Sequence, residues 1–150
     1  MRGVLGRLLL LSVLAVAPAA AQEEDPIKIT ADKFVVDEEA RLATFTGNVV
    51  VVRNDMTVWA PTVVVDYGEG GPSNIKSFVA SGGVRIKTDD QDATGDRAIY
   101  DPGAKTLRIT GNVMVINAQS TVGSPDLVLD LEANTTTFSG GRVTGIFTPQ

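Results

Sequence analysis

The sequence contains the stretch Ala43-Thr44-Phe45-Thr46-Gly47-Asn48-Val49-Val50-Val51, in which apolar and polar side chains alternate on both sides of a glycine. Alternation with a period of two is typical of a β-strand with one buried and one solvated face. The apolar phase continues from Phe45 through Gly47 to Val49 and Val51, whereas the alternative, a two-residue hairpin, would reset it. We therefore expect one strand that bends at Gly47, where the missing side chain relieves crowding.

A four-fold internal repeat extends this pattern along the chain. Each copy has an aspartate after one apolar strand and a glycine within the next. The aspartates are Asp37, Asp66, Asp101 and Asp130, and the glycines are Gly47, Gly82, Gly111 and Gly140. The step from a glycine to the next aspartate never varies, and the step from an aspartate to its glycine is equal in copies one, three and four.

The second copy is longer than the others because it carries one six-residue insertion, in the glycine-rich loop 67–77. Constant spacing elsewhere defines a 29-residue unit and predicts units that stack and bury a continuous face together. The aspartates are expected to cap turns, as the segment Asp101-Pro102-Gly103 indicates. In the fourth copy the apolar phase slips by one position, so its bend is expected to differ.

Composition favours an all-β chain. Residues 22–150 contain 17 Val, 8 Ile and 15 Thr, which strands prefer over helices. The chain has no His and no Cys, which excludes a Cys- or His-ligated metal site, a thiol nucleophile, a disulfide and a lipid-anchored cysteine. A formal net charge of −5 argues against a non-specific nucleic-acid binder. No cofactor and no enzymatic activity are expected.

The first 21 residues read as a cleavable export signal, with 22–150 as one mature domain. Arg2 and Arg7 form a positive start, Leu8–Val16 is a short apolar run, and Ala19 and Ala21 fit a cleavage site before Gln22. A membrane anchor is the alternative, but a span needs about 20 apolar residues. The expected product is an exported, soluble protein, and the short apolar run suits a bacterial periplasm.

The apolar phase also predicts the residues that face inward, which could equally form an ordinary core. They include Ile27, Ile29, Phe34, Val36, Phe45, Val49, Val51, Val63, Val65, Val84, Ile86, Tyr100, Leu107, Ile109, Val113 and Leu129. Trp59 falls outside this phase, with a surface and a core position both open. The acidic segment 89–92, followed by Asp96, could bind Ca²⁺ but matches no EF-hand spacing, so a solvated hairpin tip is favoured.

Three segments carry a family resemblance: 26–33, 43–51 and 107–113, the last two sharing Thr-Gly-Asn-Val. They resemble the OstA-type domain of LptA-like lipopolysaccharide-export proteins, and the resemblance covers residues 26–148. It implies an open β-jellyroll with a V-shaped cross-section, built from bent, mostly antiparallel strands. It also implies that the residues given above line a groove for lipopolysaccharide acyl chains, with Ile27, Ile29, Ile86 and Tyr100 at family lipid-contact positions.

The resemblance further implies how the protein works and what it binds. Domains of this family stack end to end into a bridge, from an LptC-like protein at the inner membrane to an LptD-like protein at the outer membrane. The expected role is therefore lipopolysaccharide transport through the periplasm. The alternative is an exported structural or carbohydrate-binding β-repeat protein, such as a parallel β-helix. That alternative favours outward aromatic ladders, whereas the aromatic residues here fall mostly in the inward phase.

Overall fold

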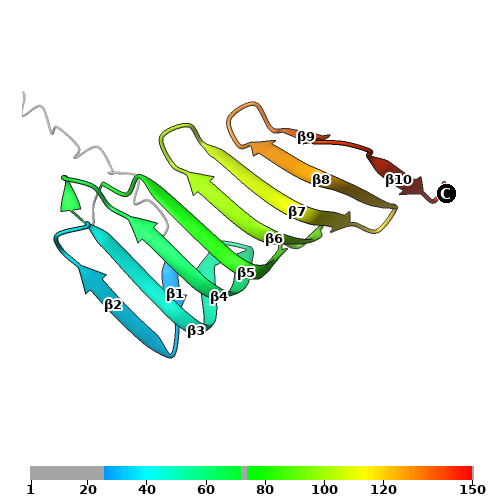
Figure 1. Ribbon diagram of the computed structural model, residues 1–150. Helices are drawn as coiled ribbons and strands as arrows, with labels where there is room; N and C mark the ends of the chain where they lie inside the picture. The colour runs from blue at the N-terminus through cyan, green and yellow to red at the C-terminus, as the bar shows by residue number, and fades with distance from the viewer. Residues whose placement is uncertain (1–25, 72–73, 150) are drawn as a thin grey trace, which may run out of the picture.

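The protein is a single twisted antiparallel sheet of ten strands (Figure 1). The computed structural model describes residues 26–71 and 74–149. The strands are β1 (Lys28–Thr30), β2 (Lys33–Asp37), β3 (Leu42–Arg53), β4 (Met56–Asp66), β5 (Ser77–Lys87), β6 (Asp92–Asp101), β7 (Thr106–Ile116), β8 (Ser120–Asp130), β9 (Thr135–Ser139) and β10 (Thr144–Phe147). The expected export signal, 1–21, lies outside the described residues. Within the described ranges, no helix is long and apolar enough to cross a membrane.

The strands follow one another as a meander, in the order β1-β3-β4-β5-β6-β7-β8-β10. β2 also pairs with β3, and β9 also pairs with β8, so each edge of the sheet consists of two short strands end to end. The two edges do not pair with each other, and the sheet therefore stays open. Every ladder is antiparallel, which excludes the parallel β-helix and confirms the expected open, V-shaped β-jellyroll.

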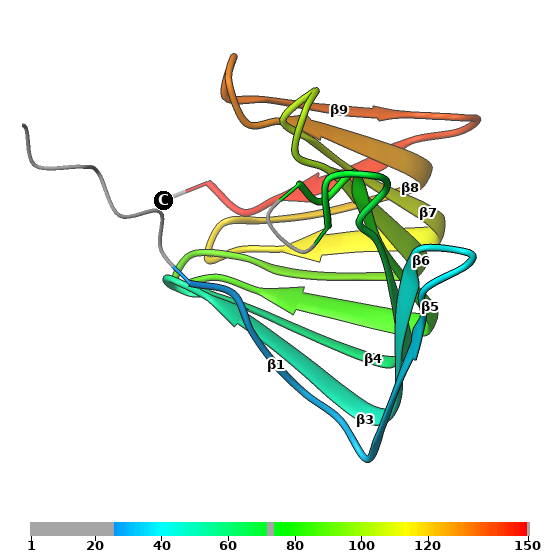
Figure 2. The same ribbon diagram turned by 90° about the vertical axis from the view of Figure 1, so that its left-hand side faces the viewer.

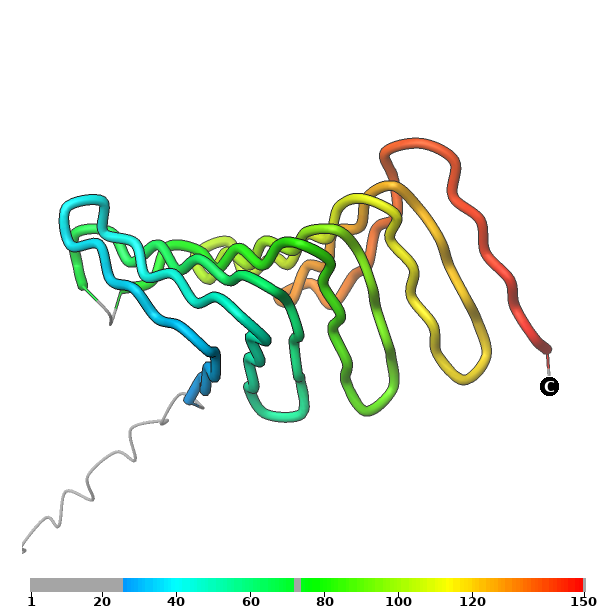
Figure 3. Tube along the Cα trace, turned by 60° about the horizontal axis from the view of Figure 1, so that its bottom comes forward, coloured from blue at the N-terminus to red at the C-terminus, as the bar shows by residue number. Residues whose placement is uncertain are grey.

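Each long strand bends near its middle, which gives the sheet its V-shaped profile (Figures 2 and 3). In β3 the pairing with β4 shifts between Thr46 and Val49, and the strand continues on both sides. Gly47 and Asn48 at this point have φ values of 82° and 46°. Such left-handed residues form a bulge that turns the strand while keeping one face inward. The predicted bend is confirmed, and the hairpin alternative is wrong.

The bends come in two alternating kinds, a feature that the constant spacing alone does not show. Gly47-Asn48 in β3 packs against Asp32, between β1 and β2, and Gly111-Asn112 in β7 packs against Asp96 of β6. The pairs 82–83 and 140–141 are both Gly-Gly, and at least one glycine of each pair packs against a proline, Gly82 against Pro61 and Gly141 against Pro125, while Gly140 also approaches Asp126. The first half of the chain maps onto the second with an offset of 64 residues before the insertion loop, taking 47 to 111 and 61 to 125, and of 58 after it, taking 82 to 140. The sheet is therefore a duplicated pair of hairpins.

All four repeat aspartates cap turns, as predicted. Asp37 and Asp101 accept hydrogen bonds from the backbone N–H groups three residues on, at 2.9 and 3.1 Å. Asp66 accepts one from Gly68 at 3.1 Å, and Asp130 accepts two, at 3.0 and 2.9 Å. Each aspartate ends a strand at the same side of the sheet, which fixes where one wall of the V stops.

The fourth bend differs from the others, as expected. Gly140 and Gly141 separate β9 from β10, and both glycines have positive φ values, 85° and 153°. The first edge shows the same interruption, because Ala31 and Asp32 separate β1 from β2. Edge strands have only one neighbour to hold them, so a bend breaks their pairing into two short segments instead of one long strand.

Candidate functional site

The concave side of the bent sheet is lined by continuous rows of apolar residues. On one wall of the V, cross-strand neighbours form the row Phe34, Phe45, Val63, Ala80, Ala98, Ile109, Leu127 and Phe138. On the opposite wall, the corresponding row is Ile29, Val51, Val58, Ile86, Ala93, Val115, Val122 and Gly145. Because each row crosses the strands, the apolar surface runs along the whole length of the sheet.

Three cavities lie in series between these two walls. The N-terminal cavity, about 550 Å³ in volume, is lined by residues of β1–β5 and of the insertion loop. The central cavity measures about 120 Å³ and the C-terminal cavity about 200 Å³. Phe78 lines both the N-terminal and central cavities, while Ile86 and Leu107 line both the central and C-terminal ones. The shared walls make the three cavities one groove.

The size of the inward side chains varies along the length of the groove. The inward row carries two phenylalanines at its start, Phe34 and Phe45, whose rings stack with centroids 4.5 Å apart. It carries two alanines, Ala80 and Ala98, where the central cavity lies. Small side chains on facing strands leave the space that larger ones would fill. The largest cavity nevertheless lies at the two phenylalanines, about 550 Å³ against about 120 Å³ at the two alanines, so the spacing of the two walls, and not side-chain size alone, sets the width of the groove.

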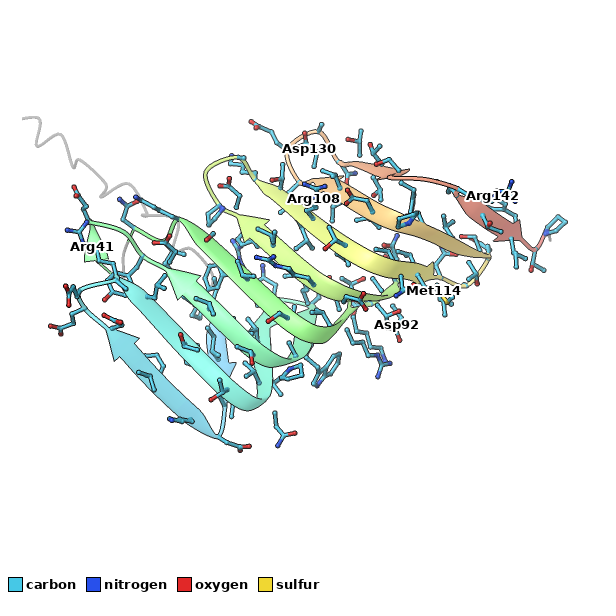
Figure 4. All side chains as sticks on the ribbon, viewed as in Figure 1. Arg41, Asp92, Arg108, Met114, Asp130 and Arg142 are labelled. Carbon is cyan, nitrogen blue, oxygen red and sulfur yellow. The ribbon has the colours of Figure 1, made fainter. Side chains whose placement is uncertain are left out.

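Charged groups are confined to the ends and the mouth of this groove. Arg41 and Glu69 form an ion pair of 3.0 Å beside the N-terminal cavity, and Figure 4 places Arg41 at that end of the sheet. Arg53 lines the central cavity, and its Nη1 donates a hydrogen bond to the Tyr100 hydroxyl at 3.1 Å. The other two ion pairs, made by Arg85 and Arg108, lie on the outer face.

Comparison with known proteins identifies the family. The family model described as "LptA/(LptD N-terminal domain) LPS transport protein" matches residues 28–135. The chain belongs to this family. The match includes both Thr-Gly-Asn-Val elements and eight of the ten strands in full.

The relatives of this chain include an LptA protein. The chain is 27% identical over 150 residues to the lipopolysaccharide export system protein LptA of Haemophilus influenzae, covering 91% of this chain and 87% of that protein. It is 31% identical over 100 residues to an uncharacterized protein of Rhizobium meliloti. That match covers 63% of this chain and 54% of the relative, so the chain spans about half of that protein's length.

A solved structure shows the same fold. The crystal structure of LptH, described as the LptA-homologous periplasmic component of the lipopolysaccharide transport device of Pseudomonas aeruginosa, matches with a TM-score of 0.74. The match covers 84% of this chain and 97% of LptH at 18% sequence identity. The open β-jellyroll expected from the resemblance is therefore the LptA-type fold.

Most residues that the sequence predicts for the groove of this LptA-type domain line one of its three cavities. They are Ile27, Ile29, Phe34, Val36, Phe45, Val51, Val63, Val65, Ile86, Tyr100, Leu107, Ile109 and Leu129. Phe34 and Val36 line the N-terminal cavity yet are 55% and 48% exposed, because β2 is an edge strand with no neighbour on one side. Contact with lipid at these positions stays a prediction.

The structure places the other three predicted residues differently. Val49, Val84 and Val113 are only 1%, 4% and 2% exposed. They lie directly after the bends, where the two walls meet, and line no cavity between the walls. Alternation alone cannot separate the apex of a V from its open part, since both positions share the same inward phase. These valines are therefore core residues at the apex.

The insertion loop supplies groove residues that sequence reasoning missed. Tyr67 and Ile75 both line the N-terminal cavity and pack against the core. The Tyr67 hydroxyl donates a hydrogen bond to the Asp37 carbonyl at 3.4 Å, which ties the loop to the end of β2. The sequence offered one signal for this contribution, namely that Tyr67 and Ile75 are large apolar residues within a glycine-rich loop. Phe138, on β9, lines the C-terminal cavity and was also missed.

The other candidate positions from the sequence, Trp59 and the acidic residues of segment 89–92 with Asp96, lie outside the groove. Trp59 faces outward, 36% exposed, with the Arg85 guanidinium 5.3 Å from the centroid of its ring. The acidic segment forms the β5–β6 turn, and Asp92 makes two hydrogen bonds with Arg85 at 3.0 and 2.6 Å. Asp96 accepts a hydrogen bond from the Asn112 amide, so it belongs to a bend. Both aspartates thus have a structural role.

Proposed function

We propose that this protein carries lipopolysaccharide across the periplasm, with the acyl chains in the groove and the sugars in water. The observation that supports this role is the continuous apolar groove, open to the side and running the length of the sheet, in a member of the LPS transport family. The expected export signal and the periplasmic relative from P. aeruginosa support the compartment.

The energetics of acyl chains explain why a groove is needed. Exposure to water costs ~0.8 kcal/mol per methylene. A chain of roughly ten methylenes therefore costs about 8 kcal/mol, and a lipid with several chains costs several times as much. Apolar contact is non-directional, so it shields the chains without holding them at one position. Shielding breaks no bond, and we therefore expect no enzymatic activity and no cofactor; the energy for transport comes from elsewhere.

The edges of the sheet support an end-to-end bridge between an LptC-like protein at the inner membrane and an LptD-like protein at the outer membrane. The N-terminal edge exposes Phe34, Val35 and Val36, and the C-terminal edge exposes Ile146 and Phe147, at 65% and 71%. Both edges also present unpaired backbone groups, which another strand can satisfy. Pairing of the C-terminal edge of one copy with the N-terminal edge of the next extends the groove without a gap.

The internal duplication predicts the register of that junction between copies. β1 and β2 correspond to β6, so Phe34 is equivalent to Ala98 in the second half of the chain. β9 pairs with β8 as β5 pairs with β4, so Phe138 is equivalent to Ala80. Because Ala80 pairs with Ala98 inside the chain, we expect Phe138 of one copy to pair with Phe34 of the next.

Photocrosslinking in cells tests the transport role. A photoreactive residue at Ile86, which lines the groove, should label lipopolysaccharide. The matched control is Lys87, its exposed neighbour on the opposite face of β5, which should give little labelling. Labelling by soluble glycan alone, from either position, would instead support the carbohydrate-binding alternative.

A further inference from the structure

One hydrogen bond joins the two walls of the groove at its mouth. Arg53 is the last residue of β3, directly before the turn at 54–55, and Tyr100 lies next to the end of β6. These strand ends belong to opposite walls, because Arg53 follows the bend of β3 and Tyr100 follows the bend of β6, which runs the other way. The 3.1 Å bond from Arg53 Nη1 to the Tyr100 hydroxyl therefore crosses the open side of the V.

The surroundings of Arg53 are otherwise apolar. Apart from Arg53 and Tyr100, every side chain that lines the central cavity is a hydrocarbon or a thioether. Across residues 26–71 and 74–149, no carboxylate lies within ion-pair distance of the Arg53 guanidinium. A half-buried cation beside an apolar cavity, with a neutral phenol as its side-chain partner, is poorly compensated. Binding of an anion would therefore stabilise the Arg53 guanidinium.

The two arginines that form ion pairs on the outer face, Arg85 and Arg108, differ from Arg53. Arg85 and Arg108 each make two hydrogen bonds to one carboxylate, with shortest distances of 2.6 Å. Their side chains are 51% and 54% exposed, on the outer face. Arg53 uses one of its five N–H donors on a side chain and leaves the planar guanidinium fork available for a bidentate acceptor. A lipid whose chain occupied the groove would place its polar head at this mouth, beside Arg53.

We propose that Arg53 is an anion-recognition residue that makes the groove selective for acyl lipids with a phosphate on the headgroup. Tyr100 holds the guanidinium at the mouth while the groove is empty, and the phosphate then replaces the neutral phenol as the stronger, charge-assisted partner. This inference rests on the proposed function, since it requires the acyl chain to lie in the groove. It concerns a headgroup contact, which apolar shielding does not provide.

Matched single-chain lipids test this selectivity. Lysophosphatidate and monoacylglycerol with the same acyl chain are titrated below their critical micelle concentrations, and displacement of a neutral hydrophobic fluorophore reports binding. We expect wild-type protein to bind lysophosphatidate about ten-fold more tightly than monoacylglycerol, in line with a charge-assisted hydrogen bond. Arg53→Gln should bring the two lipids to within two-fold of each other without weakening monoacylglycerol binding.

Three control variants separate recognition from packing. Arg53→Lys keeps the charge and should keep part of the preference, while Tyr100→Phe should keep nearly all of it, because the phosphate contacts the guanidinium. Arg85→Gln removes an arginine from the outer face and should change neither affinity. Thermal unfolding checks that each variant is folded. If Arg53→Gln does not fold, the comparison of wild type with Arg53→Lys still tests the proposal.

Each result separates this inference from the function on which it rests. A preference for lysophosphatidate that persists in folded Arg53→Gln overturns the role of Arg53 and leaves the groove intact. If neither lipid displaces the fluorophore from the wild-type protein, the proposed lipid-binding groove is wrong. Inorganic phosphate should not displace lysophosphatidate at equal concentration; if it does, the residue binds free phosphate and the lipid selectivity is wrong.

Discussion

Asn48 donates a hydrogen bond to the carboxylate of Asp32 at 3.1 Å, and this bond holds the edge of the sheet onto its first bend. The backbone N–H of Asp32 also donates to the Gly47 carbonyl at 2.9 Å. The same side-chain bond recurs at the equivalent positions of the second half, between Asn112 and Asp96 at 3.4 Å. The Thr-Gly-Asn-Val element therefore attaches a bent strand to the adjacent segment through a hydrogen bond of its asparagine. The groove forms because the neighbouring strands bend at matching positions.

Replacement of Gly47 by alanine should destabilise the protein by about 2–5 kcal/mol, the sum of a conformational and a steric cost. Its φ of 82° is left-handed, which costs a residue with a side chain roughly 1–2 kcal/mol. A Cβ there would also lie 2.6 Å from Asp32 Oδ2, and relief of such crowding costs about 1–3 kcal/mol more. Equilibrium unfolding in urea measures the free energy of unfolding of each variant. Gly83→Ala is the matched control, since its φ is 98° but nothing lies within 4 Å; equal losses would show that contact with Asp32 is unimportant.

Acid should weaken the ion pair of Arg108 and Asp126 on the outer face (Figure 4 labels Arg108). The hydrogen bond from Arg108 lowers the pKa of the Asp126 carboxyl below its ordinary value of 3.8. A carboxyl with a lowered native pKa stabilises the fold fully above its unfolded pKa, and that contribution is lost as the pH falls through the native value.

The measurement is the melting temperature of wild type and Asp126→Asn as a function of pH. Wild type should be more stable near pH 7, and the difference should shrink below about pH 4 as Asp126 becomes protonated. Asp89→Asn, at an exposed turn, serves as the control and should change little. A difference that stays constant down to about pH 2 would show that the charge of Asp126 contributes nothing.

A charge in the groove should block lipid transport while leaving the fold intact. Ile29 lines the N-terminal cavity and is only partly buried, so Ile29→Asp should fold, yet it places a carboxylate against the acyl chains. We expect depletion of lipopolysaccharide at the cell surface, measured by surface labelling. Lys28→Asp changes the exposed neighbour and should have no such effect. Normal surface levels with folded Ile29→Asp would contradict the mechanism.

Disulfide trapping should confirm the register between copies. By equivalence with Val79 and Ile99, Thr137 of one copy should pair with Val35 of the next. The chain has no native cysteine, so the double variant Thr137→Cys and Val35→Cys should form a ladder of cross-linked oligomers on oxidation.

The control for this trapping is Thr137→Cys with Lys33→Cys, which moves one cysteine two residues along the same face. That shift is about 6.6 Å, beyond the reach of a disulfide in the predicted register. Non-reducing gel electrophoresis separates the products. Stronger cross-linking of the control pair would show that the junction does not repeat the β5–β6 pairing.

Sequence patterns predicted the strands and the turns well because both depend on local interactions. Alternation around Gly47 depends on the two faces of one strand, and the Asp37 and Asp101 turns depend on hydrogen bonds three residues apart. Constant spacing then revealed the repeat. The same patterns did not reveal the role of Tyr67, because a loop residue reaches the groove only through a contact with a distant part of the chain, at Asp37.

The sequence by itself determined that the chain forms bent strands with one apolar face, because side-chain alternation and glycine placement act within a few residues. Only the tertiary structure decided which of the apolar residues line the groove. Val49 and Ile86 share one inward phase, but the first lies where the walls meet and the second where they separate. That distinction depends on how far apart two distant strands lie, as does the approach of Arg53 to Tyr100 across the mouth.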